Sequence, residues 1–165
     1  MELTHFSDLY LAELQELRSM KEQLVDAHQR LAEAAHNSRL TQEFMKHHEE
    51  TEAQIERIDK LLQKHGVKGN GHRDQAMEAL VHESEKMIEI VPESELRDVA
   101  LIASAQKIAH YEIAAFGSAA ELAGQLDLPD DQKVLHACAQ EEKRTDNALS
   151  KLAKVEINPS AVAAA

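Results

Sequence analysis

Glycine and proline, the residues that interrupt regular secondary structure, are scarce in this chain. Its 165 residues include 5 glycines and 3 prolines, and three of the glycines stand close together at Gly66, Gly69 and Gly71. The stretches between these breaks are rich in alanine, leucine, glutamate, lysine and glutamine, which favour helices. Aromatic residues make up only 3% of the chain, so a fold of many short strands is not expected. The pattern predicts long helices joined by few loops.

The breaks divide the chain into four long helices and one shorter helix. We expect helices at about residues 7–36, 38–65, 73–90, 94–126 and 129–155, of which the third is the short one. Gly66 is suited to end the second helix, and Pro129 is tolerated at the start of the last. This order predicts an all-α, antiparallel four-helix bundle with the shorter helix between the second and third long helices. Residues 1–157 would form the single domain, and residues 158–165 a flexible C-terminal tail.

Charge and composition exclude several classes of function. The formal net charge of −12 disfavours nucleic acid and anionic membranes as partners, because both require clustered lysine and arginine. No stretch approaches the ~18 apolar residues of a membrane span, and the acidic N-terminal segment lacks the pattern of a signal peptide. Cys138, the single cysteine, cannot form an internal disulfide and fits a reducing compartment. We therefore expect a cytoplasmic protein, with no nucleophile elbow or phosphate-binding loop.

Carboxylates fall on the apolar faces of the predicted helices. A helix turns about 100° per residue, which places one glutamate within the apolar stripe of the first, fourth and fifth helices. The stripe of the second helix carries a polar group at its edge. The glutamates are Glu13, Glu112 and Glu142, and the second-helix group is His47, Glu50 and Gln54.

Several carboxylates at matching depth in a bundle predict a metal centre. A buried unpaired carboxylate costs several kcal/mol, so such groups are paired or bind metal, and glutamates from packed helices build the dinuclear sites of ferritin-like bundles. Oxygen and imidazole ligands suit iron first, with manganese or zinc as alternatives. We expect two metal ions per chain, acting on oxygen, peroxide or iron itself. The predicted ligands are Glu13, Glu50, Glu112 and Glu142, with His47, Gln54 and Asp146 as further candidates.

Each of these residues taken alone also has an ordinary explanation. A glutamate on a helical face commonly reaches water or pairs with lysine or arginine, and an isolated histidine is commonly hydrogen-bonded. The alternative hypothesis is therefore a non-catalytic structural or interaction bundle whose core carboxylates are hydrogen-bonded or ion-paired without metal. The sequence assigns no catalytic residue and leaves open whether the protein is an enzyme.

Four separated motifs resemble the YciE/YciF family of bacterial ferritin-like stress proteins, and the resemblance covers nearly the whole chain. It implies a ferritin-like bundle, a homodimer, a bacterial cytoplasmic setting and a role in the stress response. It also implies metal ligands at the four glutamates predicted above. The motifs are Leu9-Tyr10 with Ala12-Glu13, His47-x-Glu49-Glu50-Thr51-x-x-Gln54, Ala105-Gln106-Lys107-x-x-His110-Tyr111-Glu112, and Glu141-Glu142-x-x-Thr145-Asp146.

The chain departs from the ferritin-like pattern at positions that bear on metal binding. Ala109 stands where the family commonly has a glutamate before His-Tyr-Glu. The usual pair of Glu-x-x-His ligands is absent, because Ala53 follows Glu50 and Thr145 follows Glu142 at that spacing. His47 could substitute for one missing histidine, whereas His110 faces away from the stripe that holds Glu112. The missing histidines favour the alternative without metal.

Overall fold

The computed structural model describes residues 3–164, and its elements are helices throughout that range. The prediction of an all-α chain with four long helices and one shorter helix is confirmed. None of the helices in residues 3–164 has the length and apolar character needed to span a membrane. The elements are α1 (Phe6–Ala34), α2 (Ser38–Lys64), α3 (Gln75–Ile90), α4 (Glu95–Gln125), α5 (Pro129–Leu152), a π-helical turn (Ala153–Ile157) and α6 (Asn158–Ala164).

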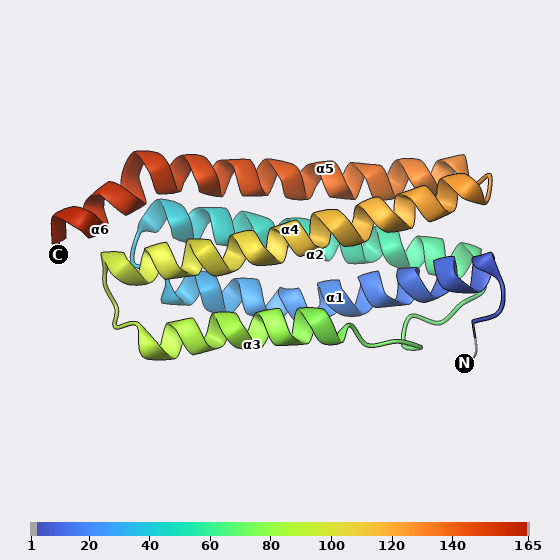
Figure 1. Cartoon of the computed structure of the whole chain (residues 1–165), viewed down its shortest axis with the longest axis horizontal. Helices are drawn as coiled ribbons and strands as arrows, with labels where there is room; N and C mark the ends of the chain where they lie inside the picture. Colours follow the sequence, from blue (N-terminus) through green and yellow to red (C-terminus); the bar gives the residue numbers. More distant parts are fainter. Residues whose placement is uncertain (1–2, 165) are drawn as a thin grey trace.

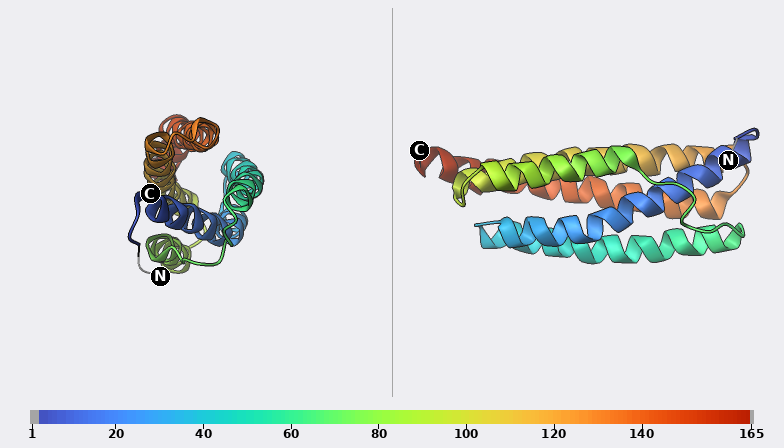
Figure 2. Two further views of the ribbon diagram at one scale, coloured as in Figure 1. Left: turned by 90° about the vertical axis from the view of Figure 1, so that its right-hand side faces the viewer. Right: turned by 90° about the horizontal axis from the view of Figure 1, so that it is seen from below.

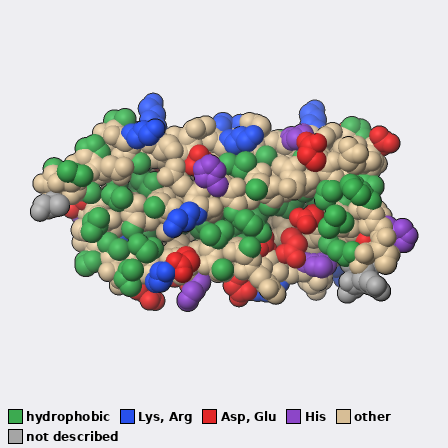
Figure 3. Space-filling view, viewed as in Figure 1, with side chains coloured by type: hydrophobic (Ala, Val, Ile, Leu, Met, Phe, Trp, Pro, Cys, Tyr) green, Lys and Arg blue, Asp and Glu red, His purple; other side chains and the backbone are tan. Residues whose placement is uncertain are grey.

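Two helical hairpins make the bundle. The hairpins α1–α2 and α4–α5 lie side by side along the long axis of the molecule (Figure 1). The end-on view in Figure 2 shows α3 outside the four long helices, where it packs against α1 and α4. On the face seen in Figure 3, hydrophobic side chains lie in several groups among charged ones, as is ordinary for a protein surface.

Short polar side chains explain where the helices begin. The side chain of Asn37 accepts hydrogen bonds from the backbone N–H groups of Arg39 and Leu40, which caps α2. Asp74 caps α3 by accepting from the N–H of Met77, so this helix begins two residues later than predicted. Gly66 follows α2 with a φ of 68°, a conformation that glycine adopts without strain.

The C-terminal segment is more helical than expected. The last long helix ends at Leu152 rather than near residue 155, and the chain continues through the π-helical turn into α6. Residues 158–164 of the predicted flexible tail thus form a helix, which packs against α4 but buries none of its side chains. Its flexibility stays a prediction. Residue 165 of the tail, and residues 1–2 of the predicted domain, lie outside the described residues.

Buried aspartates hold the two ends of the bundle. Near the α1–α2 turn, Asp98 accepts hydrogen bonds from the backbone N–H groups of His36 (2.8 Å) and Asn37 (3.0 Å). At the opposite end, fully buried Asp131 accepts from the Tyr10 hydroxyl at 2.8 Å. It also pairs with Lys64 at 2.5 Å and with His65 at 2.6 Å. These contacts tie the start of α5 to both helices of the first hairpin.

The buried faces of α1, α2 and α5 repeat at alternating steps of three and four residues, as in coiled-coil packing. Two apolar clusters result, one towards each end of the bundle, and several polar side chains are buried near its middle. The seam of α1 runs through Leu14, Leu17, Lys21, Leu24, His28 and Leu31, and that of α2 through Leu40, Phe44, His47, Thr51, Gln54, Ile58 and Leu61. The seam of α5 runs through Leu135, Cys138, Glu142, Thr145, Leu149 and Leu152.

Candidate functional site: a buried charged layer

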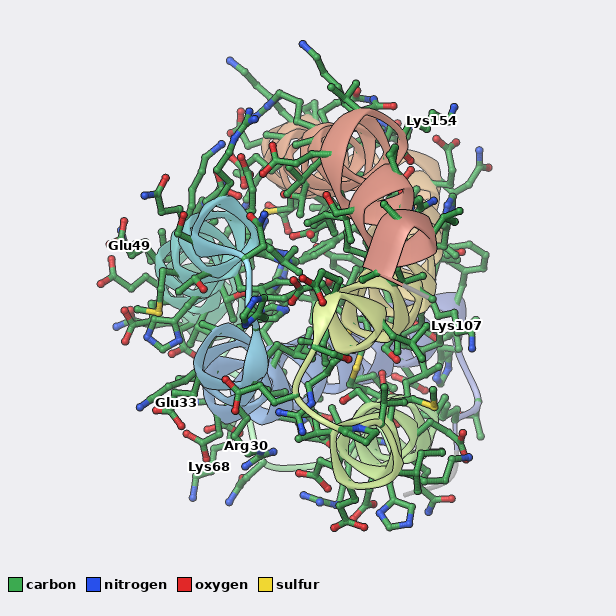
Figure 4. All side chains as sticks on the ribbon, turned by 90° about the vertical axis from the view of Figure 1, so that its left-hand side faces the viewer. Arg30, Glu33, Glu49, Lys68, Lys107 and Lys154 are labelled. Carbon is green, nitrogen blue, oxygen red and sulfur yellow. The ribbon has the colours of Figure 1, made fainter. Side chains whose placement is uncertain are left out.

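One charged or ionisable side chain from each long helix meets in the middle of the core. The four are Lys21, His47, Glu112 and Glu142, and each is at most 3% exposed. Most charged side chains instead point outward, as do the labelled Glu33, Glu49, Lys107 and Lys154 in Figure 4. A buried charge is tolerated only when it is paired, so the contacts within the layer decide its chemistry.

The Lys21 ammonium lies between the two carboxylates. Its Nζ donates to Oε1 of Glu112 in a short contact and to Oε1 of Glu142 at 3.2 Å. The Nε2 atom of His47 lies 2.7 Å from Oε2 of Glu142 and 3.7 Å from Oε2 of Glu112. Each carboxylate therefore has a cationic or protonatable neighbour on both sides.

Two buried polar side chains flank the layer. His28 stacks on His47 with ring centroids 4.0 Å apart and an angle of 30° between the rings, and its Nδ1 lies 3.2 Å from Oγ1 of Thr51. Gln54 is fully buried and donates from Nε2 to Glu141 at 2.9 Å. Arg57 also binds Glu141, through two nitrogens. This second set of contacts joins α2 to α5.

Burial and ion pairing act in opposite directions on Lys21, His47 and Glu142. Burial alone would lower the pKa of the Lys21 ammonium, but attraction by Glu112 and Glu142 outweighs burial and raises that pKa. The pKa of His47 is raised in the same way, chiefly by Glu142. Burial would raise the pKa of Glu142, but Lys21 and His47 together lower it. The arrangement thus favours the charged forms of all three groups.

Glu112 and His28 are held towards their neutral forms. Burial and repulsion by Glu142 raise the pKa of Glu112 despite the contact with Lys21. Burial, followed by the positive charge at His47 and Lys21, holds the pKa of His28 well below its ordinary value. The Oε2 atom of Glu112 is fully buried and has no hydrogen-bond partner. It is the least satisfied polar atom of the charged layer.

Glu13, predicted as a metal ligand, lies in a different place. It lines an open cavity of about 550 Å³ beside α3, together with Glu16, Asp74 and Tyr111. The Tyr111 hydroxyl donates to Asp74. Burial, and then repulsion by Glu16 and Asp74, raises the pKa of Glu13. Glu13 therefore does not join Glu112 and Glu142.

Two further predicted ligands also lie outside the layer. Glu50 is 31% exposed, and its Oε2 accepts a long hydrogen bond of 3.4 Å from Thr145 on α5. Asp146 accepts from Gln106 at 3.0 Å and lies 3.5 Å from exposed His110. Of the seven predicted ligands, the structure brings together Glu112, Glu142 and His47, places Gln54 beside them, and leaves Glu13, Glu50 and Asp146 apart.

Sequence reasoning missed Lys21 and His28. In the sequence, Phe6 and Leu9 look like part of the apolar stripe of α1 that holds Glu13, but they are 48% and 39% exposed, so the buried face of this helix lies elsewhere. The signal that could have found the missed residues is the three-and-four spacing that places Lys21 and His28 among buried leucines. A lysine at such a position is expensive unless carboxylates meet it there.

The carboxylates and imidazoles of the layer can be compared with the ligands that the di-metal centre of a ferritin-like bundle requires. Two divalent ions need bridging carboxylates and about four negative charges. This layer has two carboxylates, and Lys21 already binds both. His28, His47 and Glu112 offer ligand atoms within 4.8 Å of one another, but lone pairs in stacked imidazole rings do not converge on one point. The arrangement does not fit two ions, and the di-metal centre stays a prediction.

Comparison with known proteins shows close relatives over almost the full length. Residues 5–162 match the family model described as a domain of unknown function, DUF892. The chain is 40% identical over 162 residues to Protein YciF of Escherichia coli strain K12. The aligned residues cover 98% of each of the two chains.

Two solved structures share the fold. One is described as the crystal structure of the E. coli stress protein YciF; it superposes with a TM-score of 0.90 at 40% identity, covering 94% of this chain and 99% of that one. The other is described as YcfI, a putative structural protein from Rhodopseudomonas palustris; its TM-score is 0.85 at 33% identity, with coverage of 90% and 95%.

Proposed function

Because the chain belongs to the DUF892 family, we propose that it is a non-catalytic helical bundle of the bacterial stress response, with a structural or interaction role. The observation that carries the proposal is the position of the Lys21 ammonium between Glu112 and Glu142. A lysine in that place supplies the positive charge that a metal would otherwise supply. The names of the relatives, a stress protein and a putative structural protein, support the same function.

Charge balance within the layer supports the proposal. Lys21 and His47 are held towards their protonated forms, Glu142 towards its ionised form and Glu112 towards its neutral form, so the layer carries no excess negative charge for a metal ion to neutralise. Binding two divalent ions would require Lys21 to leave a fully buried position and other carboxylates to enter. Oxygen or peroxide chemistry of the ferritin-like kind has no support from such a set.

We assign the charged layer a role in alignment of the four helices. Each helix contributes one member, so sliding any helix by one turn would leave a charge buried without its partner. Single polar groups at core positions of coiled coils fix register in the same manner. A rigid, uniquely packed bundle suits a structural or interaction protein. A cytoplasmic homodimer, implied by the resemblance, is part of this proposal, and light scattering on the purified protein tests its mass.

Metal analysis is the test of the proposed function. Protein is produced in media supplemented with iron or with manganese, and its metal content and thermal unfolding midpoint are measured before and after chelation. The proposal predicts far less than stoichiometric metal and no change in the midpoint. It fails if about two ions bind per chain and are lost on Glu142→Gln substitution but retained on Glu13→Gln substitution, which lies outside the layer.

A further inference from the structure

We infer that Lys21 is the residue that excludes metal from this core, and that the side chains around it form a masked site for a single divalent transition-metal ion. The inference rests on the proposed function and deepens it, since it names the residue that makes the core metal-free. The masked site consists of His28, His47, Glu112 and Glu142.

The ammonium occupies the position where a cation would serve both carboxylates. Lys21 is fully buried, and it is the only lysine or arginine that contacts Glu112 or Glu142 among residues 3–164. Removing it leaves two carboxylate oxygens without their cation in a medium of low dielectric constant. A divalent ion between them would restore neutrality with His28 and His47 uncharged, since two negative charges balance one doubly positive ion.

Beyond the charge balance, two features of the site point to metal as the replacement. Oε2 of Glu112 is a fully buried acceptor without a hydrogen bond. Ligand atoms of His28, His47 and Glu112 also lie within 4.8 Å of one another. Two imidazoles with two carboxylates form a mixed nitrogen and oxygen set, which suits cobalt or zinc in a four-coordinate site.

Lys21 masks this site in two ways. Its positive charge repels a second cation only a few ångströms away, and its contact with Oε1 of Glu112 turns that carboxylate towards α1. The stacked rings of His28 and His47 must also rotate before their lone pairs converge. Removal of the lysine frees the volume into which the carboxylates and an ion can move.

The test uses Lys21→Met protein and Co²⁺ as the probe. Co²⁺ bound by nitrogen and oxygen ligands in a four-coordinate site absorbs visible light more strongly than the hydrated ion, so binding is read directly. We expect about one Co²⁺ per chain in Lys21→Met protein, a new visible band, and a higher unfolding midpoint when Co²⁺ is present. Wild-type protein should show none of these.

Two control variants separate the masked site from adventitious binding. Lys64→Met removes another lysine paired with a buried carboxylate, Asp131, at the end of the bundle, and should gain no cobalt band. Lys21→Met combined with Glu112→Gln removes a ligand and should lose the band.

A folded Lys21→Met variant without the cobalt band overturns the inference, as does a band that survives Glu112→Gln. If Lys21→Met protein does not fold alone, refolding with Co²⁺ is measured by circular dichroism; recovery of helix that depends on Glu112 supports the inference, and no recovery overturns it. Stoichiometric cobalt in the wild type would instead contradict the proposed function itself, so the two failures are distinct.

Discussion

Replacing Lys21 by methionine removes the charge at the centre of the bundle while nearly keeping the length of the side chain. In metal-free buffer with a chelator, Glu112 and Glu142 then lose their shared cation, and both are essentially fully buried. Breaking a buried ion pair by removing one partner typically costs about 3–5 kcal/mol. That is a large part of the roughly 5–15 kcal/mol by which domains are stable, so the variant should remain folded but unfold much earlier.

The cost should also depend on pH in a defined direction. The pKa of Glu112 is raised in the folded state, and removal of Lys21 raises it further. Where a carboxyl group is protonated in the folded state but ionised in the unfolded state, the free energy of unfolding falls as pH rises towards the folded pKa. The fall is about 1.4 kcal/mol per pH unit. The window for this loss opens above the ordinary glutamate pKa and extends to higher pH in the variant than in the wild type. Below about pH 7 both proteins lose stability at the same rate, and the gap between them should widen above about pH 7, where the loss in the wild type ends and the loss in the variant continues.

Denaturant unfolding followed by circular dichroism across this pH range measures the effect. Lys107→Met is the control, because Lys107 points to solvent on α4 (Figure 4) and its loss should change the unfolding free energy by less than about 0.5 kcal/mol. A Lys21→Met variant within about 1 kcal/mol of the wild type, or a loss that does not change with pH, would refute the ion-pair reasoning.

Three further predictions concern single residues. Asp131→Asn should destabilise the protein by about 1.5–3 kcal/mol in thermal unfolding, because the hydrogen bonds that the buried carboxylate accepts from Tyr10, Lys64 and His65 lose its negative charge; an unchanged midpoint would contradict this. The pKa of His28 is held well below its ordinary value, so the unfolded state takes up this proton first as pH falls below about 6.5. Wild-type stability should thus fall more steeply between about pH 7 and about pH 5 than that of His28→Leu, and equal slopes would rule the burial argument out. Burial raises the pKa of the Cys138 thiol to about 11, so a thiol reagent should label it only after unfolding; rapid labelling of the folded protein would be the contrary result.

The helices could be predicted from the sequence because local signals mark them. Asn37 and Asp74 cap their helices through hydrogen bonds to residues two or three positions further on, and Gly66 ends α2 through its own positive φ. The helix boundaries follow these three residues closely. The transition from α5 through a π-helical turn into α6 carries no such signal, since Pro159 falls in the first turn of α6, where proline is tolerated. That part of the chain was accordingly predicted to be less regular than it is.

The candidate site could be predicted only in part because its register depends on tertiary packing. Glu112 and Glu142 were found since their neighbours on the same helix face are apolar and buried. Glu13 was placed beside them because Phe6 and Leu9 look like core residues in the sequence, yet both are exposed. Lys21 carries no comparable signal in the sequence, because a lysine in an apolar stripe is ordinarily expected to reach water along its stem. Only the partner helices reveal that two carboxylates meet it.

A crystal of the wild-type protein soaked in Mn²⁺, with anomalous difference density calculated at the bundle centre, tests the central claim most directly. The account predicts ordered density for the Lys21 side chain between Glu112 and Glu142, with no anomalous peak in that layer. A pair of anomalous peaks bound by these carboxylates, with the lysine displaced from them, would contradict it.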